Sequence, residues 1–455
     1  MNLLKAGFAR VNVTPMLGIH IVGYYKTRLA EGVLDDLQIN ALALECGDKK
    51  ALLLCIDHCG CKQHIMNEYR EAISKATGVP VEAIFISATH THTGPVIKED
   101  FNHDPSADFT LELEYHQFVL RKMADVAVMA LADLKPARMG WGIGNAPNIA
   151  FVRRFRMKDG SVKTNPGVDN PDIVAPIGDV DERVNVIRFD QEGGASLVLV
   201  NFGDHPDTVG GNLISGDWPY FLRKTVEDAI DNTKCIFFNG AQGDVNHVNV
   251  HPRGGYLNDM FMDFDDVARG YGHARFMGRV VAGAVLQTYD KVQYEDVDTL
   301  RYLQHTLRVP ANLPTAEELP EAKRIKQLHM EGRDAELPYS GMMLTTVVAE
   351  ALRMVRLENG PDVFEMPLSA IAIGKVALLG IPGEPFTGIG RGLKESEDWD
   401  LVALCCLTNG SEGYFPMQDA YDEGGYEARS SSFKAGVAEL MIKEGKQLLK
   451  DLKKV

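Results

Sequence analysis

The segment Ala83–Pro95 reads Ala-Ile-Phe-Ile-Ser-Ala-Thr-His-Thr-His-Thr-Gly-Pro and passes from an apolar run into a polar one. Ala83–Ser87 predicts a buried strand. His90 and His92 follow its carboxyl end, where α/β proteins place their sites. Residues two apart in an extended segment point to the same side. We therefore expect both imidazoles to face one site, although two solvated or core-bonded histidines in a turn would give the same string.

Outward from this segment, short apolar runs alternate with stretches of helical periodicity. The predicted strands are Leu42–Leu44, Ala51–Asp57, Ala83–Ser87, Val184–Phe189, Ala195–Phe202, Lys234–Asn239, Ala370–Ile373, Val376–Ile381 and Leu401–Leu407. The predicted helices are Lys62–Thr77, Leu111–Leu134, Trp218–Ile230 and Ser431–Leu452. Two further helical segments between Ala311 and Arg356 are flanked by prolines and predict an insertion or lid. We expect an α/β fold with mixed β-sheets, helices packed outside and this helical insertion near 311–356.

The composition excludes several classes of protein. The 455 residues include 63 acidic and 47 basic ones, a net charge of −16, so nucleic acid is not an expected partner. Met1–Arg10 lacks the apolar core of a signal peptide, and no apolar run reaches the ~20 residues of a membrane-spanning helix. The seven cysteines are an odd number and several lie in apolar runs, as buried thiols do. We expect a reduced, cytoplasmic protein without a transmembrane segment.

Three further strand ends carry polar side chains: Gly203–Pro206 after Val198–Phe202, Asn239–Asn246 after Cys235–Phe238, and Pro382–Thr387 after Val376–Ile381. Taken singly, His205 is typical of a bonded core histidine and Glu384 of a helix cap. Together with His90 they supply two imidazoles and a carboxylate, which is a hydrolytic zinc set with a position left open for water. Such a metal lowers the pKa of bound water to about 7 and polarises a carbonyl oxygen.

Several segments, taken in chain order, resemble the signature segments of the neutral/alkaline (non-lysosomal) ceramidase family. They are Ala88–Pro95, Asn148–Gly160, Asp181–Asp190, Asn239–Asn246, Pro382–Thr387 and the tyrosine series Gly413-Tyr414, Tyr421 and Tyr426. The resemblance spans most of residues 5–430. Members of that family are zinc amidases that cleave the N-acyl bond of ceramide to a sphingoid base and a fatty acid.

The resemblance implies a role for each matching residue. The implied zinc ligands are His90, His205, Glu384 and Tyr414. His92 would lie beside the metal as a proton shuttle or as a hydrogen-bond partner of the substrate. Arg153 or Arg154 would hold a substrate oxygen, since a fixed guanidinium suits a developing oxyanion, and Tyr426 would be a second oxyanion donor. Without the resemblance, Tyr414 is typical of a half-buried tyrosine and the two arginines of a surface hairpin.

The chain also departs from the family pattern. Asn246 stands where the family has a serine important for activity; an amide cannot act as a nucleophile, but it can position water or substrate by hydrogen bonding. Pro385 follows Glu384 where the family continues directly into Phe-Thr. The chain stops after its terminal helix, so we expect a single ceramidase-like metallohydrolase domain over residues 1–455, without the C-terminal β-domain of full ceramidases. These departures favour a substrate other than ceramide.

The sequence thus predicts a zinc-dependent hydrolase that cleaves an amide bond of a small or N-acylated substrate through a metal-activated water. An ester or lactone would use the same machinery. The alternative is a non-catalytic metal- or ligand-binding protein on the same fold, and iron or manganese would suit the same ligands. No Gly-x-Ser-x-Gly motif is present, which disfavours a serine hydrolase. The oligomeric state is left open.

Overall fold

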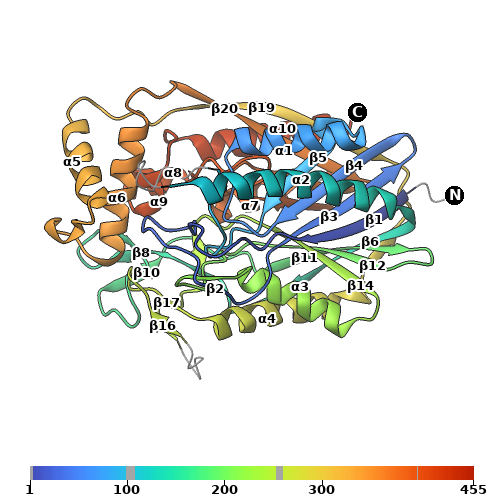
Figure 1. The fold of residues 1–455 in the computed structure, drawn as a ribbon, viewed down its shortest axis with the longest axis horizontal. Coiled ribbons are helices and arrows are strands. Elements are labelled where there is room, and N and C mark those ends of the chain that lie inside the picture. The colour runs from blue at the N-terminus through green and yellow to red at the C-terminus, as the bar shows by residue number, and fades with distance from the viewer. Residues whose placement is uncertain (1–3, 99–107, 253–259, 397) are drawn as a thin grey trace.

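The computed structural model describes residues 4–98, 108–252, 260–396 and 398–455. Its largest sheet has nine strands (Figure 1). Eight of them follow one another across the sheet as β14 (Thr233–Asn239), β12 (Ser196–Phe202), β11 (Arg183–Gln191), β6 (Lys135–Asn145), β1 (Leu4–Asn12), β3 (Gln38–Cys46), β4 (Lys49–Ile56) and β5 (Ile84–Ala88), while β18 (Gln293–Glu295) pairs with β6. The β4–β5 and β12–β14 pairs are parallel and the other neighbours are antiparallel, so the sheet is mixed as predicted.

A second sheet stacks on the first. Its strands are β19 (Leu300–Pro310), β20 (Val363–Ile373), β21 (Val376–Gly380) and β23 (Leu401–Cys405). Alternate residues of β21 belong to different cores, because Leu378 packs into the cluster shared with the large sheet and Leu379 into a cluster formed with helix α10 (Val437–Leu452). This alternation follows from the two-residue period of a strand.

The helices cover the outer faces of the two sheets. In β12, Leu197 and Leu199 face the inner core, whereas Val198 and Val200 pack with α3 (Asp217–Ala229) and α4 (Tyr271–Tyr289). Helices α1 (Gln63–Thr77) and α2 (Thr110–Ala132) pack on each other and on the β1–β3–β5 region, and α7 (Thr387–Lys394) packs beside α10. The molecule is therefore layered, with two sheets between helices, and the predicted fold class is confirmed.

The predicted helical insertion is present between β19 and β20. These strands pair from Leu300 opposite Ile373 to Pro310 opposite Val363, and the chain leaves the end of this hairpin to form α5 (Leu319–Met330) and α6 (Gly341–Arg356). The two helices share their own apolar cluster. They project at the end of the molecule opposite the N-terminus (Figure 1). Within the described segments, no helix has the length and apolar character needed to cross a membrane.

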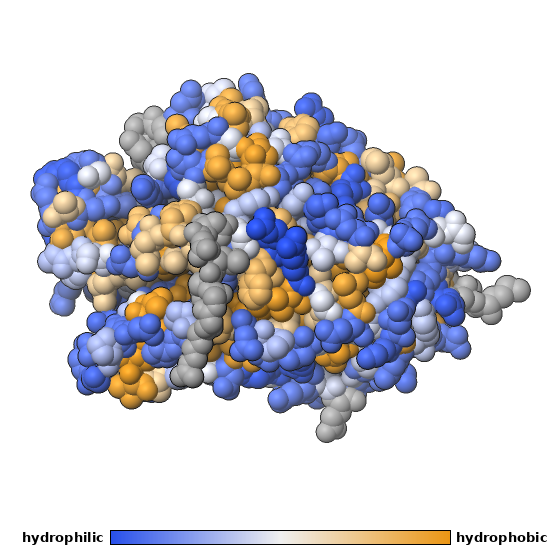
Figure 2. All heavy atoms as spheres, turned by 90° about the horizontal axis from the view of Figure 1, so that it is seen from below, coloured by the Kyte–Doolittle hydropathy of each residue, from blue (hydrophilic) through white to orange (hydrophobic). Residues whose placement is uncertain are grey.

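Most differences from the sequence prediction are helices and strands that the prediction did not include. Strands β1, β6 and β19 and helix α4 were not predicted. The last helix begins at Val437 rather than Ser431, because Gly436 has a left-handed φ of 94° and Phe433 forms a β-bridge with Ala311. The face seen in Figure 2 is mostly hydrophilic, with several hydrophobic patches between the hydrophilic residues.

Candidate metal centre

Four chain segments that leave strand ends meet at one buried point. His90 follows β5 and His205 follows β12. Glu384 begins the short strand β22 (Glu384–Pro385), which pairs in parallel with β24 (Tyr414–Phe415), so that Glu384 lies opposite Tyr414. The structure therefore brings together all four predicted ligands, although they are spread over more than three hundred positions of the chain.

The ligand atoms of three of these residues converge. Nε2 of His90 lies 3.2 Å from Nε2 of His205, and Oε2 of Glu384 lies 3.3 Å from each of the two nitrogens. The hydroxyl of Tyr414 lies 3.5 Å from Nε2 of His205. All four side chains are buried. Separations of this size leave room for a small cation between the atoms but not for another side chain.

The hydrogen bonds of the two imidazoles decide which nitrogens are free. Nδ1 of His90 lies 2.5 Å from the carbonyl oxygen of Cys59, and Nδ1 of His205 lies 2.8 Å from that of Gln242. A carbonyl oxygen only accepts, so each Nδ1 carries a proton and Nε2 is the nitrogen that faces the centre, where it offers a lone pair whenever the ring is neutral. Two lone pairs and a carboxylate oxygen facing one another fit a cation, and two imidazoles with a carboxylate suit zinc.

Burial and mutual contact shift the pKa values of these groups. Burial lowers the pKa of His205 to about 4. Burial also acts to lower the pKa of His90, but Cys59 and Glu384 outweigh it and raise this pKa well above its usual value. The pKa of Glu384 is held well below its usual value by the two imidazoles despite burial. Glu384 is therefore the carboxylate that supplies negative charge at the centre.

His92 lies beside this centre. Its Nε2 is 3.3 Å from Nε2 of His90, and the two rings meet edge to face at 4.8 Å. The prediction that both residues face one site is correct, but its reason was wrong: the chain is not extended at His90, which has a left-handed φ of 80°. Such strain in a non-glycine residue is typical of functional positions. Burial lowers the pKa of His92 well below its usual value, against the effect of Asp207, so the ring is neutral.

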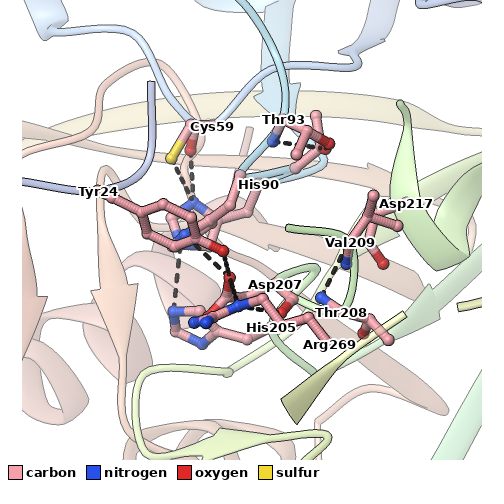
Figure 3. Close-up of polar contacts among 12 residues, drawn as sticks. Tyr24, Cys59, His90, Thr93, His205, Asp207, Thr208, Val209, Asp217 and Arg269 are labelled. Atoms are coloured by element: carbon pink, nitrogen blue, oxygen red, sulfur yellow. Dashed lines mark hydrogen bonds and ion pairs between the residues drawn. The ribbon is translucent and has the colours of Figure 1, made fainter. Parts of the chain in front are cut away.

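A polar network that the sequence analysis missed lies beside His92, 3.5 Å from its Nδ1 atom at the nearest point. It is formed by Asp207, Arg269 and Tyr24 (Figure 3). The Asp207 carboxylate accepts hydrogen bonds from Arg269, at 2.8 and 3.0 Å, and from the Tyr24 hydroxyl. The Tyr24 ring lies between two guanidinium groups, with Arg28 at 4.0 Å and Arg269 at 4.8 Å from its centroid. Asp207 follows His205 by two residues, and this position in the same strand-end segment could have indicated from the sequence that it lies near the site.

The structure separates the two predicted arginines. Arg153 donates to Glu427 and to the carbonyl of Gly243, both at 2.7 Å, and its guanidinium lies 5.4 Å from the Tyr414 ring centroid. Arg154, the first residue of β8 (Arg154–Met157), makes different contacts: its guanidinium lies 3.6 Å from the Glu423 carboxylate. Arg153 is thus the member of the pair beside the centre, and Arg154 is placed away from it.

Tyr426 and Asn246 also differ in placement. Tyr426 packs edge to face on Tyr414, with 5.6 Å between ring centroids. Asn246 is buried and bonded elsewhere: its amide donates to Asn165 at 3.1 Å and accepts from the backbone N–H of Val248 at 3.0 Å. Asn246 is not among the described residues that line the cavity at the centre.

That cavity has a volume of about 220 Å³ and gives the centre access to a small ligand. Its walls include the following predicted site residues: His90, His92, Glu384, Tyr414 and Tyr426. Tyr24, Tyr25 and Cys59 contribute further polar groups. A convergent set of polar groups in a cavity is the usual form of a small-molecule site.

Fold and centre together define an α/β protein with a buried histidine–carboxylate site open to a cavity. Its fold is that of neutral ceramidases. The structure of neutral ceramidase from Pseudomonas aeruginosa superimposes with a TM-score of 0.74 at 17% identity, over 100% of this chain and 75% of that one. A ceramidase complexed with C2 gives a TM-score of 0.72 at 16% identity, over 100% and 76% of the two chains.

The resemblance read from the sequence is thus confirmed at the level of the fold, which this chain shares with the two ceramidase structures at low identity. No protein-family model matches its sequence. No curated protein matches it either.

Proposed function

We propose that this protein is a metal-dependent hydrolase that cleaves an amide bond of a small or N-acylated molecule. One observation carries the proposal: the Nε2 atoms of His90 and His205 and the Oε2 atom of Glu384 converge within 3.3 Å at the wall of a cavity, with both Nδ1 protons committed to carbonyl oxygens. The shared fold of the neutral ceramidases supports an amide as the bond cleaved. An ester or lactone would meet the same groups.

His90, His205 and Glu384 would hold the metal, with Tyr414 as the fourth ligand. When bound, zinc would supply a Lewis acid for the scissile carbonyl and a water of lowered pKa. The ligand chemistry also suits iron or manganese. Arg153 lies behind Tyr414, where its charge acts against the rise that burial causes in the pKa of the phenol.

The remaining groups of the chain handle protons and charge. The neutral His92 imidazole would take a proton from the attacking water and return it to the leaving nitrogen. Tyr426 lines the cavity, and its hydroxyl would donate a hydrogen bond to the substrate carbonyl as negative charge develops on the carbonyl oxygen. The burial of His90, His205 and Glu384 keeps bulk water away from the reacting atoms.

The test compares metal content and hydrolysis in the wild type and in His205→Ala, with His305→Ala as the control. His305 lies on β19 and is not among the cavity residues. We expect near-stoichiometric zinc and turnover of N-octanoyl amides in the wild type and in the control, and loss of both in His205→Ala.

Full activity with full metal in His205→Ala would overturn the proposal. Bound zinc without hydrolysis of amides, esters or lactones, and without binding of a hydroxamate, would instead establish a closed non-catalytic metal site.

A further inference from the structure

We propose that the wall of this cavity contains a binding subsite for an oxyanion, centred on Arg356, so that the substrate carries a carboxylate or a phosphate group. The inference deepens the proposed function, because it names the substrate class at the same site. The subsite itself is a statement about binding and can be tested without turnover.

Arg356 is the last residue of α6, in the helical insertion, and its side chain lines the cavity that His90 and Glu384 also line. The residue is exposed to solvent there. Its Nη2 donates to the hydroxyl of Ser432 at 2.8 Å. Among the residues described, no carboxylate forms an ion pair with this guanidinium. The guanidinium therefore keeps donors and a full charge for a ligand.

The carboxylate of Glu412 on the same wall interacts with other groups than Arg356. Glu412 lines the cavity, but its Oε1 accepts the backbone N–H of Gln63 at 2.9 Å, at the start of α1. Its Oε2 lies 3.7 Å from Nζ of Lys62. One carboxylate is thus shared between a helix terminus and a lysine, and it acts on the charge of Arg356 without forming an ion pair with it.

The wall around Arg356 has the chemistry of an oxyanion site. Lys62 contributes a second cation, and the hydroxyl residues Ser411, Ser430 and Ser432 lie on the same wall. A guanidinium binds carboxylate and phosphate through paired hydrogen bonds, which makes arginine the usual residue for these groups. Two cations with one carboxylate on this wall contrast with a chain whose net charge is −16.

The position of Arg356 also fits a substrate that extends past it. A second cavity of about 450 Å³ shares Lys62, Arg356, Glu412 and Ser432 with the first. Its other walls include Leu357 and Phe364. An anionic group held by Arg356 would therefore lie between the hydrolytic centre and a partly apolar hollow.

A simpler role for Arg356 is to complement the negative end of the α6 dipole, as basic residues in a last turn do. Arg353 in the same turn shows what such a residue does here: it is buried and donates to the carbonyl of Asn312 at 2.6 Å, away from the cavity. The helix dipole accounts for a basic residue at this end of α6. It does not account for an exposed guanidinium in the wall of the cavity that the candidate centre also lines.

The test uses three amides with the same acyl group: N-octanoylglycine, N-octanoylphosphoethanolamine and the neutral N-octanoylethanolamine. Hydrolysis is measured as kcat/KM and binding by isothermal titration calorimetry. We expect the wild type to prefer one of the anionic amides by about tenfold or more, the size of a charge-assisted hydrogen-bond pair. The preferred anion distinguishes carboxylate from phosphate.

The preference should fall about tenfold in Arg356→Gln and should weaken with added salt. Arg308→Gln is the control, because Arg308 is an exposed arginine on β19, paired with Glu365 and absent from the cavity wall. It should keep the wild-type preference. Arg356→Lys keeps the positive charge but loses the paired donors of the guanidinium, so its preference for the anionic amide should lie between those of the wild type and Arg356→Gln. It replaces Arg356→Gln if circular dichroism shows that Arg356→Gln is unfolded.

The two proposals fail in different ways. If the wild type hydrolyses and binds all three amides equally, the subsite is overturned and the proposed function stands. If it hydrolyses none but binds an anionic amide preferentially, and Arg356→Gln loses that preference, the subsite stands and the proposed function fails. An undiminished preference in Arg356→Gln would also overturn the subsite.

Discussion

Oδ1 of Asp207 lies 3.5 Å from Nδ1 of His92. Asp207 follows His205 by two positions, so a single strand-end segment supplies a proposed metal ligand and the carboxylate that faces the proposed proton carrier. The same carboxylate is bonded to Arg269, which in turn is bonded to Asp265 at 2.7 and 2.9 Å. His92 is therefore held against a charged network that is itself fixed in the core.

The network should be strongly coupled. Removing the charge of Arg269 with Arg269→Met leaves the buried Asp207 and Asp265 carboxylates uncompensated, and we expect it to lower the free energy of unfolding by about 3–5 kcal/mol. Asp207→Asn should cost less, because Arg269 keeps Asp265. The double variant should cost less than the sum of the two, with a coupling of about 0.5–3 kcal/mol. Urea unfolding followed by tryptophan fluorescence measures all three.

A surface pair provides the control for that cycle. Arg308 and Glu365 lie 2.8 Å apart but are exposed, and such pairs contribute about 0–1 kcal/mol. The cycle Arg308→Met with Glu365→Gln should show almost no coupling. Equal coupling in the two cycles would contradict the structural role given to Asp207.

Metal removal should destabilise the protein, because a metal that binds only the folded state adds its binding free energy to folding. Zinc at a hundredfold excess over its dissociation constant should raise the free energy of unfolding by about 2.7 kcal/mol. Glu384→Gln removes the charged ligand, and the effect should vanish in this variant. Glu365→Gln, on the surface, should keep it. Thermal unfolding with added zinc or chelator gives the answer, and a zinc shift that survives in Glu384→Gln would place the metal elsewhere.

Asp217 should make stability depend on pH. It is buried and accepts hydrogen bonds from the backbone N–H groups of Thr208 at 2.9 Å and Val209 at 2.8 Å (Figure 3). Burial nevertheless raises its pKa to about 7. The folded state thus binds a proton more tightly than the unfolded chain, and this contribution to stability is complete below about pH 4 and is lost as the pH rises towards 7.

Asp217→Asn isolates that contribution, since asparagine tolerates the left-handed φ of 57° at this position. Its free energy of unfolding should fall less steeply than that of the wild type between about pH 4 and 7. Asp228→Asn is the control, because Asp228 is an exposed carboxylate on α3. Parallel pH profiles for wild type and Asp217→Asn, measured by urea titration, would show that Asp217 is charged throughout.

Gly243 should be essential to the position of Glu384. A Cβ atom at Gly243 would lie 2.5 Å from the carbonyl oxygen of Glu384 and 3.1 Å from that of Pro385. Gly243→Ala must therefore push β22 outward, and we expect a loss of about 1–3 kcal/mol in stability and of about tenfold or more in metal affinity. Gly283→Ala in α4 is the control: nothing lies within 4 Å of its Cβ position, and alanine should stabilise the helix by about 0.5–1 kcal/mol. Unchanged zinc affinity in Gly243→Ala would show that the contact between Gly243 and Glu384 does not position the metal ligand.

The sequence identified most of the inner strands because they are apolar on both faces, as Ala51–Ile56 shows. Strands with one exposed face were missed: β6 carries three glycines, and β19 mixes polar residues with apolar ones without a long apolar run. Helix α4 was missed as well, because its sequence contains several glycines and few charged residues, which is not typical of an amphipathic helix. Local composition gives no sign that sheet pairing or packing on α3 will stabilise such segments.

For the candidate site, the chemistry available at each strand end could be read from the sequence: His90, His205 and Glu384 follow apolar runs, and the order of the segments indicated the resemblance to neutral ceramidases. Which of these groups meet depends on how distant parts of the chain pack together. Strand order places His90 beside His205 across 115 positions and Tyr24 beside Asp207 across 183. The packing of the elements also places Arg153, but not Arg154, beside Tyr414. It brings Arg356 of the helical insertion to the wall of the cavity. A local pattern fixes the direction of a side chain within its own element, whereas the neighbours of that side chain depend on how the elements are paired and packed.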